Sequence, residues 1–182
     1  MDVQRLAEAL VAGDAPAVRD ALRDDRGLAA AYHEDGWPML HLAATAEVAQ
    51  LLLDAGADIN APNKHKVFGP GNRPLHAAVY NNREDVVDLL LARGADVNAR
   101  DNAGWTPLHM AVANGRFGLA LKLLDAGADP NAQLGQMKGQ EWSNKAPLDL
   151  LSLADRTGEG AREPDPAADE AMRTLLVQYG AR

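Results

Sequence analysis

Cysteine is missing from this chain of 182 residues, so its fold cannot depend on disulfides and no thiolate can hold a metal. Long apolar runs are missing too, since the longest span a few residues. The start, Met1–Arg5, has neither a basic region nor an unbroken apolar stretch. We therefore expect no signal peptide and no membrane span, and a chain without cysteine suits the reducing cytoplasm.

Positive charge is scarce, because 18 Lys and Arg stand against 26 Asp and Glu, for a net charge of -8. Phosphate binding needs a basic surface, so the charge argues against nucleic acid as the main ligand. Lys and Arg are absent from Ala31–Ala61, whereas Pro62–His76 has three cations and no acid. The sequence therefore predicts a basic segment on an acidic body.

One ten-residue segment occurs three times with small changes. The copies are Leu51–Asn60, Leu89–Asn98 and Lys122–Asn131, and each follows a Leu-His pair. The last two copies lie 33 positions apart, as do His76 and His109. Recurrence at this period is typical of a solenoid of stacked repeats, which offers a long surface for binding.

The stretch Gly104-Trp105-Thr106-Pro107-Leu108-His109-Met110-Ala111, followed by Gly127-Ala128-Asp129-Pro130-Asn131, resembles the ankyrin repeat. The resemblance implies an all-α solenoid in which each repeat is a β-turn finger followed by two antiparallel helices. Thr106 is a good helix N-cap and Pro107 suits the first helical turn. Gly56, Gly94 and Gly127 follow apolar runs and are typical of helix ends.

We expect a single domain over 1–182 with no tail, made of five repeats. The repeats are an N-terminal cap (1–33), 34–61, 62–99 with a long finger, 100–132, and a C-terminal cap (133–182) with a long finger and an insertion between its helices. Expected cap helices are Val3–Ala12, Pro16–Arg23 and Met172–Tyr179.

Repeat lengths indicate where the pattern is interrupted. About five extra residues are expected near Pro62–Pro70, about seven near Leu134–Glu141 and about thirteen within Arg156–Ala168, against the 33-residue period. The second repeat is short, because His41 to Gly56 spans 15 positions where His76 to Gly94 spans 18. Its first helix is therefore expected to be a stub.

Three histidines in register, His41, His76 and His109, invite a zinc hypothesis. Stacked helices lie about 8–10 Å apart, whereas zinc bonds are about 2 Å long, so we expect each ring to bond backbone between repeats instead. His65 stands among cations, but no motif places a nucleophile or carboxylate beside it. We therefore expect no enzyme, no metal and no cofactor.

Tryptophan occurs only in expected finger segments, and Trp37 and Trp105 both follow the finger glycine. The family resemblance places this position on the concave side, where partners bind, although the rings could instead pack finger against finger. Phe117 is expected in the core. The residues predicted to bind a partner lie in the fingers or at first-helix ends: Lys64, Lys66, Phe68, Asn72, Tyr80, Asn81, Asn102, Trp105, Asn114, Trp142 and Lys145.

The expected ligand is a folded protein, such as a toxin or an enzyme with an acidic patch, bound by a monomer. The simplest role is inhibition, as in small bacterial immunity proteins, and the Ala-rich composition suits a bacterial source. Three alternatives stay open: an adaptor that bridges two proteins, a structural subunit that self-associates, and an enzyme or metal-dependent protein that uses the region of His65.

Overall fold

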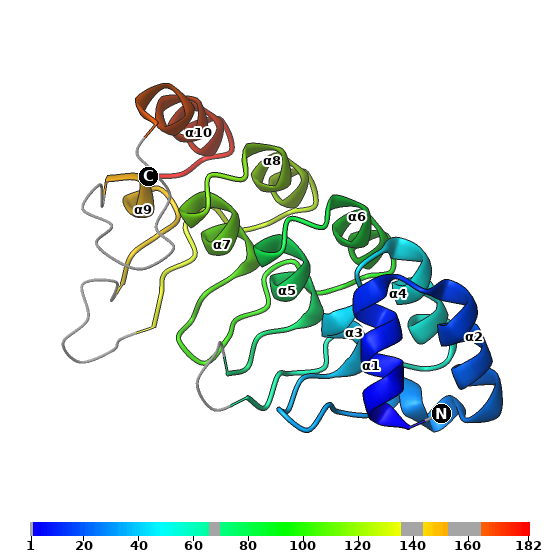
Figure 1. The fold of residues 1–182 in the computed structure, drawn as a ribbon. Helices are drawn as coiled ribbons and strands as arrows, with labels where there is room; N and C mark the ends of the chain where they lie inside the picture. Colours follow the sequence, from blue (N-terminus) through cyan, green and yellow to red (C-terminus); the bar gives the residue numbers. More distant parts are fainter. Residues whose placement is uncertain (1, 66–69, 136–143, 153–164) are drawn as a thin grey trace. The chain divides into compact units, whose positions relative to one another are not determined.

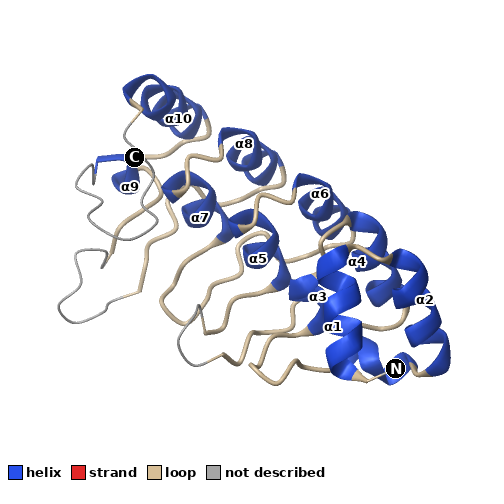
Figure 2. Cartoon of the chain, in the orientation of Figure 1, coloured by secondary structure: helices blue, strands red, loops and turns tan. Residues whose placement is uncertain are grey.

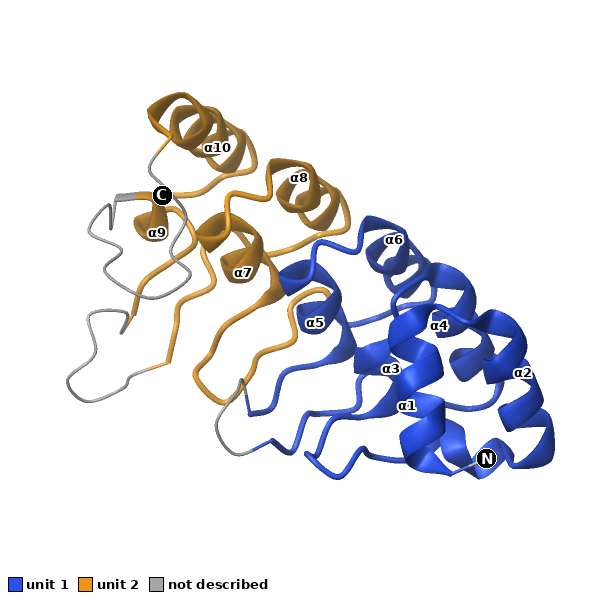
Figure 3. Cartoon of the chain, in the orientation of Figure 1, with its two compact units in different colours: residues 1–96 blue, residues 97–182 orange. Residues whose placement is uncertain are grey.

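Helices in consecutive pairs make up the chain in the computed structural model (Figure 1). The structure describes residues 2–65, 70–135, 144–152 and 165–182. Two compact units divide the chain, Met1–Asp96 and Val97–Arg182 (Figure 3). The expected partition into one domain of five repeats stays a prediction.

The described residues of unit 1 form three helix pairs. Their bounds are α1 Val3–Ala12, α2 Ala15–Asp24, α3 Met39–Leu42, α4 Ala46–Asp54, α5 Pro74–Tyr80 and α6 Glu84–Ala92, with a 3₁₀ helix at Arg26–Ala30 after α2. Unit 2 contains α7 Pro107–Ala113, α8 Phe117–Asp125, α9 Asp149–Ser152 and α10 Pro166–Gln178. The described residues form no strand (Figure 2). The expected all-α class is confirmed.

The N-terminal helices form where the apolar spacing predicts them. Asp2 caps α1 by accepting a hydrogen bond from the Arg5 N–H at 2.9 Å, and Leu6 and Leu10 are fully buried one helical turn apart. Gly13 ends α1 with a φ of 70°, which a side chain rarely adopts. The bounds expected for α1 are confirmed, and α2 begins one residue before the expected Pro16.

The stub expected in the second repeat is confirmed, since α3 has four residues and no side-chain cap. Arg83, just before α6, stabilises the end of α3 by donating from Nη1 to the Ala43 carbonyl oxygen at 2.8 Å. Partial burial lowers the pKa of Arg83. A side chain from the next repeat thus satisfies a carbonyl group at the end of the short helix.

Asparagines of the repeated segment bond to the segments that follow the second helices of unit 2, α8 and α10. The Asn98 amide donates to the Gly127 carbonyl oxygen at 3.1 Å, and its Oδ1 accepts from the Asp129 N–H at 2.8 Å. Asn131 makes the same two bonds one repeat later, to Gly180 and Arg182. The recurrence of Asn in the sequence is therefore explained by bonds between successive repeats.

Two expectations near α8 and α10 are wrong. The last helix begins at Pro166 rather than Met172, because Asp165 caps it and Pro166 takes the first helical position. The insertion before this helix therefore ends before Pro166 rather than at Ala168. Phe117, expected in the core, is 43% exposed. It is the first residue of α8, and the buried residues of that helix begin at Leu119.

Candidate protein-binding surface

A finger is the segment between the second helix of one pair and the first helix of the next. Backbone hydrogen bonds close the two short fingers. The His33 N–H donates to the Trp37 carbonyl oxygen at 2.8 Å, and the Asp101 N–H donates to that of Trp105 at 3.0 Å. In both short fingers the two closing residues are four positions apart.

The long fingers are closed by the same kind of bond across longer loops. The Asn63 N–H donates to the Asn72 carbonyl oxygen at 2.8 Å, and the Leu134 N–H donates to that of Lys145 at 2.9 Å. These pairs are nine and eleven positions apart, in agreement with the five and seven extra residues expected. Asn144 takes the place of the finger glycine and has a φ of 59°. In the sequence, the extra residues of each long finger therefore fall between its two closing residues.

Neighbouring fingers also bond to each other within each unit. In unit 1 the Lys64 N–H donates to the Gly36 carbonyl oxygen at 2.9 Å, and in unit 2 the Gly135 N–H donates to that of Ala103 at 3.0 Å. A Cβ placed on Gly104 would lie 2.4 Å from the Gly135 nitrogen. Glycine is required there because the next finger approaches too closely for a side chain.

Buried histidines link the first helices to the fingers, as expected. The His41 Nε2–H donates to the Asn72 carbonyl oxygen at 3.0 Å, and that of His109 donates to the Lys145 carbonyl oxygen at 3.3 Å. The His109 Nδ1 lies 2.8 Å from the Thr106 hydroxyl oxygen and accepts from the Thr106 N–H at 3.2 Å. These rings stabilise the fold and do not converge on a metal ion.

Burial lowers the pKa of His41 and of His109 from 6.5 to about 4. The bonds to carbonyl oxygens oppose this shift, because they favour the charged form, but desolvation is the larger effect. Both rings are therefore neutral near pH 7 and carry their proton on Nε2.

Aromatic and cationic side chains of unit 1 pack finger against finger. The Trp37 ring stacks on His65, with centroids 5.7 Å apart, and contacts His41 at 5.8 Å. The Lys64 ammonium lies 3.8 Å from the centre of the Tyr32 ring. The packing alternative for Trp37 is thus present in the structure. The His65 ring, the basis of the catalytic alternative, is packed against an indole.

Candidate residues at the ends of the first helices differ in exposure. Tyr80, the last residue of α5, is 63% exposed, and Asn81 follows it on the surface. The side-chain amides of Asn81 and Asn114 donate to carbonyl oxygens one turn back, at 2.9 and 2.8 Å. These two asparagines therefore also cap the helix ends on which they stand.

The other candidates lie in or beside the fingers. Asn102 is exposed at a finger turn, whereas Asn72, Trp105 and Lys145 are half-buried. Asn72 and Lys145 are held by their backbone carbonyls, which accept from His41 and His109. Lys66, Phe68 and Trp142 lie outside the described residues.

The candidates fall into separate groups. Unit 1 holds Lys64, Asn72, Tyr80 and Asn81, and unit 2 holds Asn102, Trp105, Asn114 and Lys145. Within unit 1, Asn72 precedes α5 and Tyr80 ends it. A seven-residue helix is about 10 Å long, so fingers and helix ends are distinct parts of the surface.

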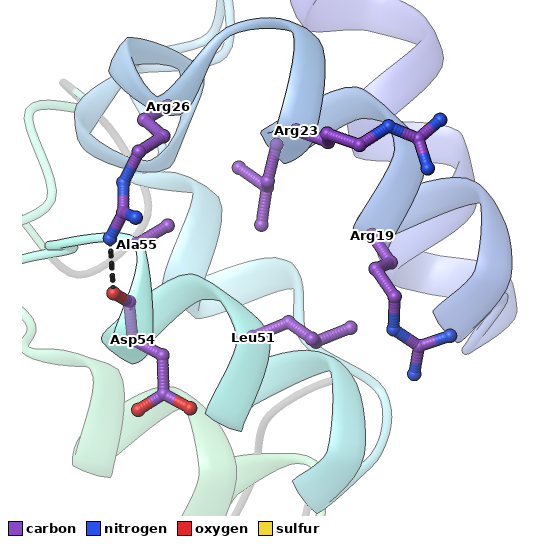
Figure 4. A pocket seen from close by; sticks show the side chains of 7 residues that line it. Arg19, Arg23, Arg26, Leu51, Asp54 and Ala55 are labelled. Atoms are coloured by element: carbon purple, nitrogen blue, oxygen red, sulfur yellow. Dashed lines mark hydrogen bonds between the residues drawn. The ribbon is translucent and has the colours of Figure 1, made fainter.

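An arginine cluster that was not predicted lines a hollow beside α2 and α4. Its members are Arg19, Arg23 and Arg26, over an apolar floor that includes Leu51. Arg26 donates to the Asp54 carbonyl oxygen at 2.6 Å, and the guanidinium groups point in different directions (Figure 4). Arg19 and Arg23 pair with carboxylates at 3.2 and 3.0 Å. Arg19 and Arg26 therefore bond to α4, Arg23 pairs within α2, and the three groups do not converge on a ligand.

A second hollow in unit 1 was also missed. It lies between α1 and the short finger before α3, and Val11 and Trp37 are among its lining residues. The 15-position spacing from His41 to Gly56 was the available signal, because it shortens the helix beside α1. Among the described residues, no helix could cross a membrane and no group of His, Asp and Glu side chains could hold a metal.

Comparison with known proteins agrees with this geometry. A family profile described as "Ankyrin repeats (many copies)" matches residues 46–91 and 75–124, which cover α4 to most of α8. The Thr-Pro-Leu-His cap, the left-handed glycines and the paired helices lie where that family has them. The chain belongs to the ankyrin-repeat family, whose repeats generally mediate protein–protein interaction and are generally non-enzymatic.

Relatives match over parts of much longer proteins. The chain is 38% identical to the Neurogenic locus Notch protein of Drosophila melanogaster over 96 residues, which are 50% of this chain and 3% of that protein. It is 34% identical to the E3 ubiquitin-protein ligase KEG of Arabidopsis thaliana over 98 residues, 52% of this chain and 5% of the ligase. It is 41% identical to the B-cell lymphoma 3 protein homolog of Mus musculus over 73 residues, which are 38% of this chain and 15% of that protein. The likeness concerns repeats and not whole proteins.

Proposed function

We propose that this chain is a non-enzymatic module that holds a folded protein through its fingers and the exposed ends of its first helices. Tyr80 carries the proposal, since it is 63% exposed at the end of α5 in a chain with only 4% aromatic residues. Tyrosine is enriched at the centres of interfaces, because it buries much area and keeps a hydroxyl for hydrogen bonding.

Binding by such a surface acts through occupation of the partner. The finer proposal is inhibition, in which the module covers the working surface of a toxin or an enzyme, as an immunity protein would. The adaptor alternative requires two partners at once. Support for either comes from the backbone hydrogen bonds that close the fingers and join neighbouring fingers within each unit, since a surface that is already ordered loses little entropy on binding.

Site-specific photo-crosslinking tests the proposal. A photoreactive residue at Tyr80 or at Asn114 should crosslink one protein in cells of the native host. Ala92, exposed on the second helix α6, provides the matched control and should give no such product. Capture at Ala92 and at Tyr80 alike, or at neither Tyr80 nor Asn114, would contradict binding through the first-helix ends.

The captured protein then decides between the finer roles. If the module inhibits, adding it in excess should abolish the partner's own activity, and Tyr80→Ala should restore that activity. Full activity of the saturated partner would exclude inhibition. Two different proteins captured together in one complex would support the adaptor.

A further inference from the structure

The first helix of the second pair is cut short beside α1. It covers four residues, whereas α5 and α7 each cover seven. The helix ends at Leu42, and two residues later the Ala44 N–H donates to the Leu10 carbonyl oxygen of α1 at 3.0 Å. Val11, in the last turn of α1, is 57% exposed. The short helix thus leaves apolar surface of α1 uncovered.

This uncovered surface is one wall of a hollow, which we call the α1 groove. Ala7 and Val11 line it from α1, Leu42 from the end of α3, and Trp37 from the finger. Its volume is about 540 Å³, within the ~300–1,000 Å³ of typical ligand sites. All of the groove lies within unit 1. Apolar groups of this kind are suited to burying an aliphatic or aromatic side chain.

The polar lining of the α1 groove carries negative charge. Glu8 and Asp35 are exposed at its edge, and the lining contains no Lys or Arg among the described residues. His33 lies between α1 and Asp35, with Nε2 2.9 Å from the Gln4 Oε1 and Nδ1 3.2 Å from an Asp35 oxygen. The groove therefore combines an apolar floor, an indole ring and two carboxylates.

We propose that the α1 groove receives an arginine-bearing apolar segment of the protein partner. The proposal rests on the binding role proposed above and adds the chemistry of one contact. A guanidinium group can stack on Trp37 and donate to Glu8 or Asp35, while its aliphatic stem covers Val11. A purely apolar segment would desolvate Glu8 and Asp35 without supplying a cation, and an acidic segment would be repelled.

The contact can be tested without knowing the partner. The probe is the peptide acetyl-Leu-Arg-Leu-amide, and the control replaces Arg by citrulline, which has the same shape without the charge. We expect the arginine peptide to shift the NMR signals of the Trp37 indole and the Val11 amide, with a dissociation constant in the ~1 mM range. The citrulline peptide should bind at least about five-fold more weakly. Trp37→Phe assigns the indole signal.

Matched variants locate the binding. Val11→Lys places a cation in the groove and should weaken the arginine peptide at least about ten-fold. Val177→Lys is the control, because Val177 is 55% exposed on α10, nearly as exposed as Val11, and it should leave binding unchanged. Both sites are on the surface, so thermal melts should show that both variants fold. Glu8→Gln should weaken binding about three-fold.

Any one of several results would overturn the groove proposal. They are unmoved Trp37 and Val11 signals at about 10 mM peptide, equal binding of the citrulline peptide, and wild-type affinity in Val11→Lys. Arginine amide binding as tightly as the peptide would also contradict it, since the apolar neighbours would then contribute nothing. Failed crosslinking at Tyr80 and Asn114 would instead refute the binding role, whatever the peptide does.

Discussion

His41 and His109, from two of the Leu-His pairs, are buried neutral donors and not titrating switches. In each of these two cases Nε2 donates to a finger carbonyl, and burial lowers the pKa of His41 and of His109 to about 4. The unfolded chain accepts a proton near pH 6.5, so between these values it binds more protons than the folded one. The contribution of these two histidines to the free energy of unfolding is therefore fully present above pH 6.5 and is lost as the pH falls toward 4.

The first prediction is a loss of stability in mild acid. Each of the two histidines should lower the free energy of unfolding by about 2 kcal/mol between about pH 7 and about pH 5. Urea unfolding at both pH values should show this loss in the wild type and a smaller one in His41→Gln and in His109→Gln. Equal losses in all three proteins would show that the buried histidines are not responsible.

Pro38 leaves His41 without one hydrogen bond. It stands where the fourth repeat has Thr106, whose hydroxyl and N–H both reach the Nδ1 of its histidine. Proline has neither group, and the His41 Nδ1 is buried with no partner. A buried ring nitrogen that loses its bond to water without gaining another is destabilising.

The second prediction is that Pro38→Thr restores that bond. We expect it to be more stable than Pro38→Ala by about 1 kcal/mol, because both variants lose the rigid ring but only threonine supplies the hydroxyl. The backbone of Pro38 is extended and suits threonine. Equal urea midpoints for the two variants would mean that the hydroxyl does not reach His41.

At the scale of elements, the sequence predicts a helix well where apolar period and cap agree. The bounds of α1 are correct because Asp2, the Leu6–Leu10 spacing and Gly13 all indicate the same segment. The repeat pattern alone predicts that α10 starts at Met172, whereas the Asp165-Pro166 cap indicates the observed start at Pro166. Local cap chemistry thus outweighs repeat alignment at the end of an insertion.

The candidate surface was predictable only in part. Exposure of Tyr80 follows from its place at the end of a first helix. The α1 groove depends instead on how far α3 extends beside Val11, and the 15-position spacing showed the shortening without showing what it uncovers. The packing of His65 on Trp37 likewise joins residues of different fingers, and the residues next to His65 in the sequence do not predict this contact.

Our third prediction concerns the contact between fingers in unit 2. Gly104→Ala should destabilise by more than about 2 kcal/mol, because its Cβ would meet the Gly135 backbone and its φ of 86° disfavours a side chain. Gly94→Ala is the matched control, with a φ of 82° and nothing within 4 Å. It should lose only about 1 kcal/mol. Similar losses in both variants would show that the close approach does not matter.

At the scale of the whole molecule, charge and length are unevenly distributed. The net charge is -8, yet Pro62–His76 carries three cations and no acid. In both long fingers the extra residues fall, in the sequence, between the two residues whose backbone hydrogen bond closes the finger. An acidic patch on a partner would be attracted to Pro62–His76 and repelled by the rest of the chain. The long fingers are therefore the sequence-based candidates for the centre of the interface.

The last prediction separates anchoring from steering in the long fingers. Phe68→Ala and Trp142→Ala should each weaken binding of the crosslinked partner by at least about 2 kcal/mol, through faster dissociation, because aromatic anchors dominate interfaces. Lys64→Ala and Lys66→Ala should instead slow association and reduce its salt dependence, because they remove charge from the rim. Kinetic binding at two salt concentrations measures both effects, and melts confirm that each variant folds. Wild-type affinity in both aromatic variants would leave the first-helix ends, at Tyr80 in unit 1 and at Asn114 in unit 2, as the candidates for binding, since those residues do not lie in the fingers.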